Sequence, residues 1–193
     1  TVIDRGAPEH DQIPLALCPA LTLLRYDPAW LDKLTPEQVA VALYAWEIWA
    51  RPEQRVPDHD WSTCGYDGAR GFGKTAGICA WTNAEVEAGR ETKIGLMAPT
   101  EARTEEVQIK GLIAAAPPWF VPERFSRDGS SGLRWPNGVE AIAFTSATSG
   151  GARGGNFSLS WFTEIVDYRA NTRAEAFANL ATATRVGRGR ILW

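Results

Sequence analysis

A glycine-rich octapeptide limits what this chain can fold into more than any other segment does. Residues 68–75 read Gly-Ala-Arg-Gly-Phe-Gly-Lys-Thr and satisfy the P-loop pattern G-x-x-x-x-G-K-[ST] at every fixed position. Its glycines permit backbone conformations that other residues avoid, so consecutive N–H groups can surround phosphates. The segment follows a strand pattern and opens a helix pattern, which disfavours the alternative of a plain glycine turn. It therefore predicts a nucleotide-binding fold.

The ligand that this motif predicts is ATP with Mg²⁺. Lys74 would reach the β- and γ-phosphates, Thr75 would bind Mg²⁺, and the helix N-terminus would add its positive end. Arg70 would contact a phosphate or Glu164 of its own subunit, or else remain a solvated loop residue. The loop residues expected to bind nucleotide are Gly68, Ala69, Arg70, Gly71, Phe72, Gly73, Lys74 and Thr75.

Strand and helix patterns alternate along most of the chain. Residues 1–35 are expected to form an extended arm, and residues 36–193 the P-loop domain. Strands are expected at 62–66, 93–98, 159–162 and 190–193, a hairpin at 133–145, and helices at 36–50, 74–88, 101–115 and 172–184. The alternation predicts an α/β fold with a mainly parallel central sheet flanked by helices.

P-loop ATPases also need a hydrophobic strand that ends in acidic residues. The candidate is Leu159-Ser160-Trp161-Phe162-Thr163-Glu164, in which Glu164 stands where the water-activating carboxylate belongs. We therefore expect a P-loop NTPase of the additional-strand catalytic-glutamate class. The alternative is a strand that merely ends at a surface glutamate.

Thr163 occupies the position of the acid that orders the Mg²⁺ shell. Its hydroxyl can hold a Mg²⁺-bound water or the Thr75 hydroxyl, but it lacks the negative charge that tightens the metal shell. Either hydrolysis is weak, or Asp167 or Glu164 compensates, or the position was altered deliberately.

In combination, these features resemble the large terminase subunits of tailed bacteriophages, and within them the branch that includes the terminase-like proteins of gene-transfer agents. The likeness covers roughly residues 40–193 and depends on the order and spacing of several stretches. They are Trp49-Ala50-Arg51-Pro52-Glu53-Gln54, Arg70 inside the P-loop, Leu96-Met97-Ala98-Pro99-Thr100, Arg134-Trp135-Pro136-Asn137-Gly138, and Ala152-Arg153-Gly154 followed by Trp161-Phe162-Thr163-Glu164.

The resemblance implies the N-terminal ATPase domain of a motor that hydrolyses ATP to translocate double-stranded DNA into a procapsid. It implies that Gln54 contacts adenine and that Arg153 acts as a finger on the γ-phosphate of a neighbouring subunit; a surface arginine is the alternative. The expected catalytic residues are Glu164, Arg153, Lys74 and Arg70, and the expected metal-binding residues are Thr75 and Thr163.

The partners that the resemblance implies are double-stranded DNA, the portal protein, the small terminase subunit and further copies in a homo-oligomeric ring. The motor would act in the host cytoplasm, without a membrane. In the family, a Ser/Thr-rich coupling motif and a nuclease domain would follow the position of Trp193.

The charge distribution is only mildly polar. Residues 1–123 hold 11 basic and 18 acidic side chains, whereas residues 124–193 hold 9 basic and 5 acidic ones. This is not the basic stripe of a dedicated nucleic-acid binder, so DNA contact is expected to be local or made mainly by another part of the protein. Two other functions remain open: another P-loop DNA motor such as a helicase, and a catalytically silent nucleotide-binding assembly module, which Thr163 suggests.

Overall fold

The computed structural model describes residues 28–46, 50, 52–57, 60–69, 71–127 and 129–193. The chain divides into two compact units, Thr1–Arg55 and Val56–Trp193. This boundary differs from the one expected after residue 35. No helix in the described ranges is both long and apolar enough to span a membrane.

The described part of the first unit is helical. Its elements are the 3₁₀-helix η3 (Pro28–Lys33), the α-helix α2 (Pro36–Tyr44) and the 3₁₀-helix η4 (Pro52–Gln54). The expected capping box is present, since Thr35 and Gln38 exchange side-chain-to-backbone hydrogen bonds of 3.0 and 3.3 Å. α2 ends at Tyr44 instead of residue 50, because Ala45 (φ −78, ψ 89) leaves helical geometry. Of the expected extended arm, residues 1–27 lie outside the described ranges, and η3 is not extended.

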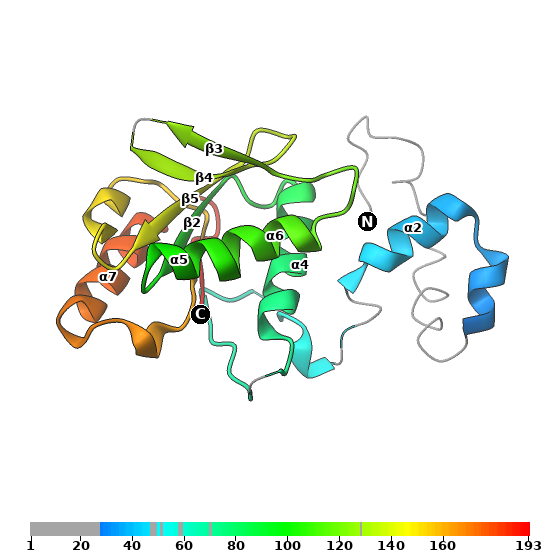
Figure 1. Cartoon of the computed structure of the whole chain (residues 1–193), viewed down its shortest axis with the longest axis horizontal. Coiled ribbons are helices and arrows are strands. Elements are labelled where there is room, and N and C mark those ends of the chain that lie inside the picture. Colours follow the sequence, from blue (N-terminus) through cyan, green and yellow to red (C-terminus); the bar gives the residue numbers. More distant parts are fainter. Residues whose placement is uncertain (1–27, 47–49, 51, 58–59, 70, 128) are drawn as a thin grey trace. The chain divides into compact units, whose positions relative to one another are not determined.

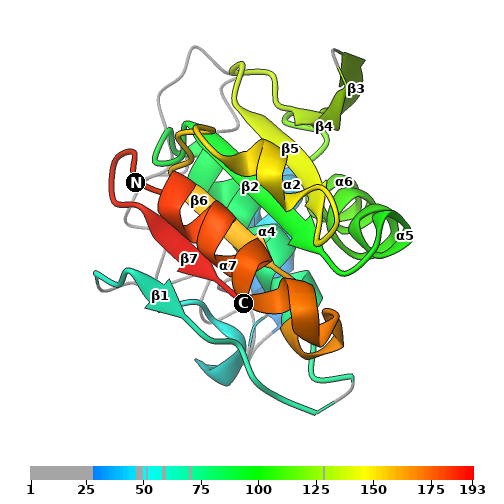
Figure 2. The same ribbon diagram turned by 90° about the vertical axis from the view of Figure 1, so that its left-hand side faces the viewer.

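The second unit is built on a seven-stranded sheet with the order β1-β7-β6-β2-β5-β4-β3. Figure 1 labels β2, β5, β4 and β3, and Figure 2 also labels β1, β7 and β6. The strands are β1 (Thr63–Cys64), β2 (Lys93–Ala98), β3 (Glu123–Arg127), β4 (Ser130–Arg134), β5 (Glu140–Thr145), β6 (Leu159–Phe162) and β7 (Arg190–Leu192). β1, β7, β6, β2 and β5 are parallel, whereas β4 and β3 extend the sheet in antiparallel fashion.

The position of β7 defines the class of the fold. β7 lies between β1, which leads into the glycine loop, and β6, which ends just before Thr163 and Glu164. The additional-strand class takes its name from a strand inserted at this position in the sheet. The expected α/β fold with a mainly parallel sheet is therefore confirmed.

Helices cover both faces of the sheet, and Figure 2 shows α7 in front of it with α4 behind. One face carries α4 (Lys74–Glu87) and a second helical stretch made of α5 (Glu101–Arg103), the π-helical segment η5 (Thr104–Ile109) and α6 (Lys110–Ala115). The other face carries α7 (Ala170–Ala183) and the 3₁₀-helix η6 (Ser149–Ala152); a further 3₁₀-helix, η7 (Ile165–Asp167), precedes α7.

Alternation along the central strands fills a separate core on each side. On β6, Leu159 and Trp161 pack into the core under α4 and α6, whereas Phe162 packs into the core under α7. On β2, Leu96 and Met97 divide between the two cores in the same way. Near-continuous apolar strands are what a sheet buried on both faces requires.

Two features of this unit were not predicted. The helix expected at 101–115 contains η5, a complete π-helical segment, at its centre. The hairpin has an additional edge strand, β3, whose side chains are largely exposed and whose charges pair with neighbours: Arg124 with Glu105, and Arg127 with Glu140. An edge strand exposed on both faces shows no apolar alternation, so the sequence pattern could not reveal it.

Candidate functional site

The glycine loop connects β1 to α4. Gly71 (φ 81) and Gly73 (φ 93) both adopt the left-handed conformation that favours glycine. Gly73 is the N-cap of α4 and provides no side-chain cap, so the first N–H groups of this 14-residue helix lack a side-chain acceptor from the N-cap. Phosphate oxygens can accept these hydrogen bonds, and the helix dipole favours their negative charge.

Lys74 lies folded back over the loop. Its Nζ donates hydrogen bonds to the carbonyl oxygens of Gly68 and Ala69, the latter at 3.3 Å. Within the described residues Lys74 forms no ion pair. No described carboxylate therefore competes with a phosphate for its ammonium group, and the loop fits a phosphate-bearing ligand.

Thr163 and Glu164 follow β6 at the carboxyl edge of the sheet. The Thr163 N–H donates to the Met97 carbonyl at 3.0 Å and so continues the ladder to β2. Alternation along β6 places Thr163 on the same face as Leu159 and Trp161, the face that α4 covers. Thr163 is 9% exposed, so a group there acts in a largely dry environment.

Glu164 adopts a left-handed backbone conformation (φ 52, ψ 47), which is uncommon for a residue with a Cβ atom. Its Oε2 lies 3.2 Å from Nε of Arg103 in α5. This oxygen is buried and accepts no aligned hydrogen bond from the described residues. The contact is therefore an ion pair that holds the carboxylate toward α5.

Tyr168 is a second neighbour of Glu164. Its hydroxyl is buried without a hydrogen-bond partner among the described residues. Burial, and then the negative charge of Glu164, raise the pKa of the Tyr168 phenol. Sequence reasoning missed both Tyr168 and Arg103. The signal for Arg103 was its place just after the carboxyl end of β2, the edge at which α/β sheets bind ligands.

Arg153 contacts its own chain on the opposite face of the sheet. Its Nε donates to Oδ1 of Asn179 at 2.8 Å, and its Nη2 lies 3.3 Å from Oε1 of Glu175, both on α7. The side chain remains 67% exposed. The described contacts of Arg153 are thus with α7 and not with the glycine loop.

Gln54 and Arg70 are the two remaining site residues expected from the sequence. Gln54 belongs to the first unit, where its carbonyl accepts a hydrogen bond of 3.3 Å from the Trp46 indole N–H. Arg70 lies outside the described residues. Both assignments stay predictions.

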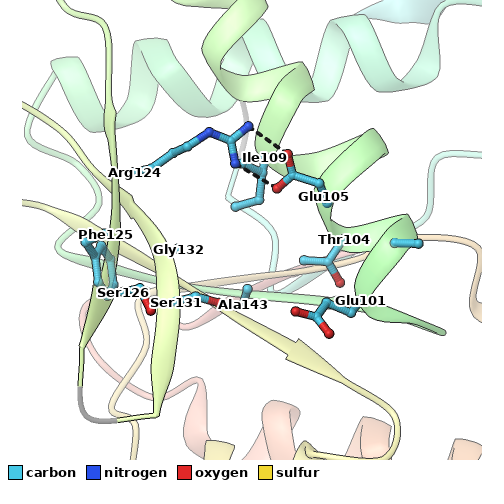
Figure 3. A pocket seen from close by; sticks show the side chains of 11 residues that line it. Glu101, Thr104, Glu105, Ile109, Arg124, Phe125, Ser126, Ser131, Gly132 and Ala143 are labelled. Carbon is cyan, nitrogen blue, oxygen red and sulfur yellow. Dashed lines mark hydrogen bonds and ion pairs between the residues drawn. The ribbon is translucent and has the colours of Figure 1, made fainter.

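A cavity of about 760 Å³ lies away from the glycine loop, between η5 and the β3–β4 hairpin (Figure 3). Arg124 and Glu105 both line it and form a two-pronged ion pair, with both N–O distances 2.7 Å. Because these two charges neutralise each other, the cavity offers no free charge from this pair to a nucleotide. The glycine loop remains the candidate site.

Comparison with known proteins bears on the fold. No protein-family model and no curated protein sequence matches the chain. Among solved structures, the large terminase of a thermophilic bacteriophage matches with a TM-score of 0.51 and 15% identity. The chain has the fold of the part of that large terminase that it covers. The match covers 80% of this chain and 37% of the bacteriophage protein, so this chain spans little more than a third of that terminase's length.

A mutant of the large terminase ATPase domain of Thermus phage P74-26 also aligns, with a TM-score of 0.47, 13% identity, and coverage of 86% of this chain and 68% of that domain. The match to the first of these two proteins, the large terminase of the thermophilic bacteriophage, confirms, at the level of the fold, the resemblance to large terminases that the sequence indicated.

Proposed function

We propose that this chain is the ATPase domain of a viral DNA-packaging motor, which hydrolyses ATP to translocate double-stranded DNA into a procapsid. The observation that carries the proposal is the glycine loop: Gly71 and Gly73 have left-handed backbones, Lys74 has no described carboxylate partner, and α4 begins at the loop. The large-terminase fold and the inserted strand β7 support the same function.

The loop residues would hold the nucleotide. When bound, ATP with Mg²⁺ supplies the phosphoryl group that water attacks. Lys74 would exchange its carbonyl partners for the β- and γ-phosphates, and Thr75 would hold the metal together with Thr163. Backbone N–H groups of the loop would surround the phosphates; the residues that supply them would be Gly68, Ala69, Gly71, Phe72 and Gly73.

Glu164 would orient the attacking water. To do so, its carboxylate must turn from Arg103 toward the glycine loop, because Oε2 is now held 3.2 Å from that guanidinium. A carboxylate is the chemical group that this role requires, because it can accept both a hydrogen bond and a proton from water.

Three assignments follow from the terminase resemblance. Arg153 would leave Asn179 and Glu175 of its own chain and reach the γ-phosphate held by a neighbouring subunit. Gln54 would contact adenine, and Arg70 would contact a phosphate. The motor would assemble as a homo-oligomeric ring with double-stranded DNA, the portal protein and the small terminase subunit, in the host cytoplasm.

The test is calorimetric titration of the chain with ATP and Mg²⁺. Lys74→Ala should weaken binding at least about tenfold, because a charge-assisted contact contributes about 1.5–3 kcal/mol. The matched control is Lys110→Ala, which removes an exposed lysine that pairs with Glu106 on its own helical stretch. If a folded Lys74→Ala chain binds ATP as tightly as the parent, the proposed site is wrong.

A catalytically silent nucleotide-binding assembly module is the second candidate. Thr163 favours it, since the position that should carry an acid is neutral, and so does the ion pair that holds Glu164. ATP binding without measurable phosphate release in the assembled motor would support the silent module and contradict the ATPase.

A further inference from the structure

Gln108 is a fully buried amide in η5 that the proposed function does not use. Its Nε2 lies 2.9 Å from the Trp161 carbonyl oxygen on β6 and 3.4 Å from the Met97 carbonyl oxygen on β2. Because carbonyl oxygens only accept, the amide nitrogen must face them. The Oε1 atom is therefore left buried, and no described residue donates a hydrogen bond to it.

The helical stretch that carries Gln108 packs against α4, the helix that begins at the glycine loop. One turn further along the same helical stretch, a Cβ atom added to Gly111 would lie 3.7 Å from Cγ2 of Thr75 and 2.8 Å from Sγ of Cys79. The helical stretch starts after β2, at the edge of the sheet where the parallel strands have their carboxyl ends, and α4 starts at the glycine loop. Gln108 comes before Gly111 in this stretch, so it is nearer that edge of the sheet. Trp161, whose carbonyl Gln108 contacts, precedes Thr163 by two residues on the same face.

The backbone at Gln108 is also unusual. Residues Thr104–Ile109 form a π-helical segment, a geometry that is rare and occurs frequently at functional sites. A buried acceptor without a donor is costly, and a polar group retained in that state calls for an explanation. The two hydrogen bonds of the amide nitrogen explain that end of the side chain and leave the buried oxygen without an explanation.

We propose that Gln108 is a positioning residue whose Oε1 accepts a hydrogen bond from a water molecule of the Mg²⁺ shell, once nucleotide binding moves the side chains that bury this oxygen in the present structure. The proposal rests on ATP and Mg²⁺ binding at the glycine loop. Mg²⁺ keeps several of its waters in nucleotide sites, and these waters need outer acceptors. Thr163 brings a hydroxyl where a carboxylate is expected, so the amide oxygen of Gln108 adds an acceptor that the strand end lacks.

The experiment compares the dissociation constant of a non-hydrolysable ATP analogue in EDTA with that in Mg²⁺, for the parent chain and three variants. The ratio of the two constants, the magnesium ratio, reports the contribution of the metal alone. Gln108→Met removes both the donor and the acceptor and should lower this ratio about tenfold. Gln108→Glu also removes the amide donor but keeps an oxygen that can ionise, so its ratio should equal or exceed that of the parent.

Asn83→Leu is the matched control, because Asn83 is a buried amide of α4 whose described partners occupy both its ends. Its Nδ2 donates to the Leu112 carbonyl at 2.9 Å, and its Oδ1 accepts from the Trp135 indole at 2.9 Å. Its removal should lower the melting temperature and leave the magnesium ratio at the parental value.

The outcomes separate the two levels of the argument. Equal ratios for Gln108→Met and the parent, or equal decreases for Gln108→Met and Gln108→Glu, would make Gln108 a purely structural residue and leave the glycine-loop site intact. A parent chain that binds no ATP analogue in either buffer would overturn the site itself, and this proposal with it. Should Gln108→Met fail to fold, a ratio for Gln108→Glu below that of the parent overturns the proposal.

Discussion

Arg103 Nε lies 3.2 Å from Glu164 Oε2, so the carboxylate expected to position water is paired with a guanidinium of its own chain. The two side chains come from different strand ends, Arg103 after β2 and Glu164 after β6. Both are partly exposed, at 53% and 34%, and such ion pairs contribute about 0–1 kcal/mol. The pair is therefore weak enough to open at little cost in free energy.

Arg103→Ala should leave ATP affinity unchanged and raise the basal rate of phosphate release by no more than about fivefold, because only the weak pair is lost. The measurement is phosphate release by the assembled motor without DNA. Arg124→Ala serves as the control, since Arg124 pairs with Glu105 at a cavity that no glycine-loop residue lines. A rate that falls sharply in Arg103→Ala would mean that Arg103 takes part in the reaction instead of restraining Glu164.

Thr163→Asp should strengthen Mg²⁺-dependent nucleotide binding by about 1–2 kcal/mol, because a charge-assisted contact to the metal shell is gained. Calorimetric titration with ATP analogue and Mg²⁺ checks this, with Thr163→Val as the variant that removes the hydroxyl at similar volume. If the aspartate variant binds no better than the parent, residue 163 does not order the metal shell and the placement of the metal site beside it is wrong.

Arg153→Ala should leave the ATP affinity of the isolated chain nearly unchanged and lower turnover of the assembled motor by about a thousandfold or more, the scale of a lost arginine finger. Co-assembly with Glu164→Ala subunits should restore some turnover, because an intact finger then meets an intact pocket at some interfaces. Two results would exclude action in trans. One is a loss of nucleotide affinity in the Arg153→Ala monomer. The other is a mixture that stays inactive at every ratio although both variants assemble.

A buried charge network predicts how stability depends on pH. Arg190, 6% exposed, donates hydrogen bonds to Glu85 and Glu91 and lies 4.7 Å from the centre of the Trp81 ring. Burial alone would raise the pKa of Glu85, but hydrogen bonds from Arg90 and Arg190 outweigh it and lower that pKa below its ordinary value of 4.5. A lowered pKa in the folded state means that Glu85 stabilises the fold fully above pH 4.5 and loses this contribution as the pH falls through its folded-state pKa.

Glu85→Gln should therefore lower the free energy of unfolding by about 1–3 kcal/mol at pH 7, and the difference from the parent should shrink as the pH falls below the ordinary glutamate range. Urea unfolding between pH 7 and pH 3 measures it. Glu106→Gln removes an exposed carboxylate paired with Lys110 and should change stability by less than about 0.5 kcal/mol. A difference for Glu85→Gln that is independent of pH would show that the lost hydrogen-bond geometry, and not the charge, accounts for it.

Features that depend on local sequence were predictable. The glycine loop, the capping box at Thr35, and the spans of β2 and β6 all follow from residues within one turn or one strand of each other. For the same reason, Lys74 and Glu164 could be named as candidates, since each is identified by its immediate neighbours.

What only the tertiary structure decided involves residues far apart in the chain. Strand pairing places β7 between β1 and β6, and strand order depends on non-local contacts that no local pattern records. The same pairing brings Arg103 to Glu164, docks Arg153 on α7, and leaves Gln108 Oε1 buried without a donor among the described residues. The neighbours of a residue in the sequence identify its candidate role. Its contact partners and its charge environment depend on which strand ends the sheet brings to the same edge.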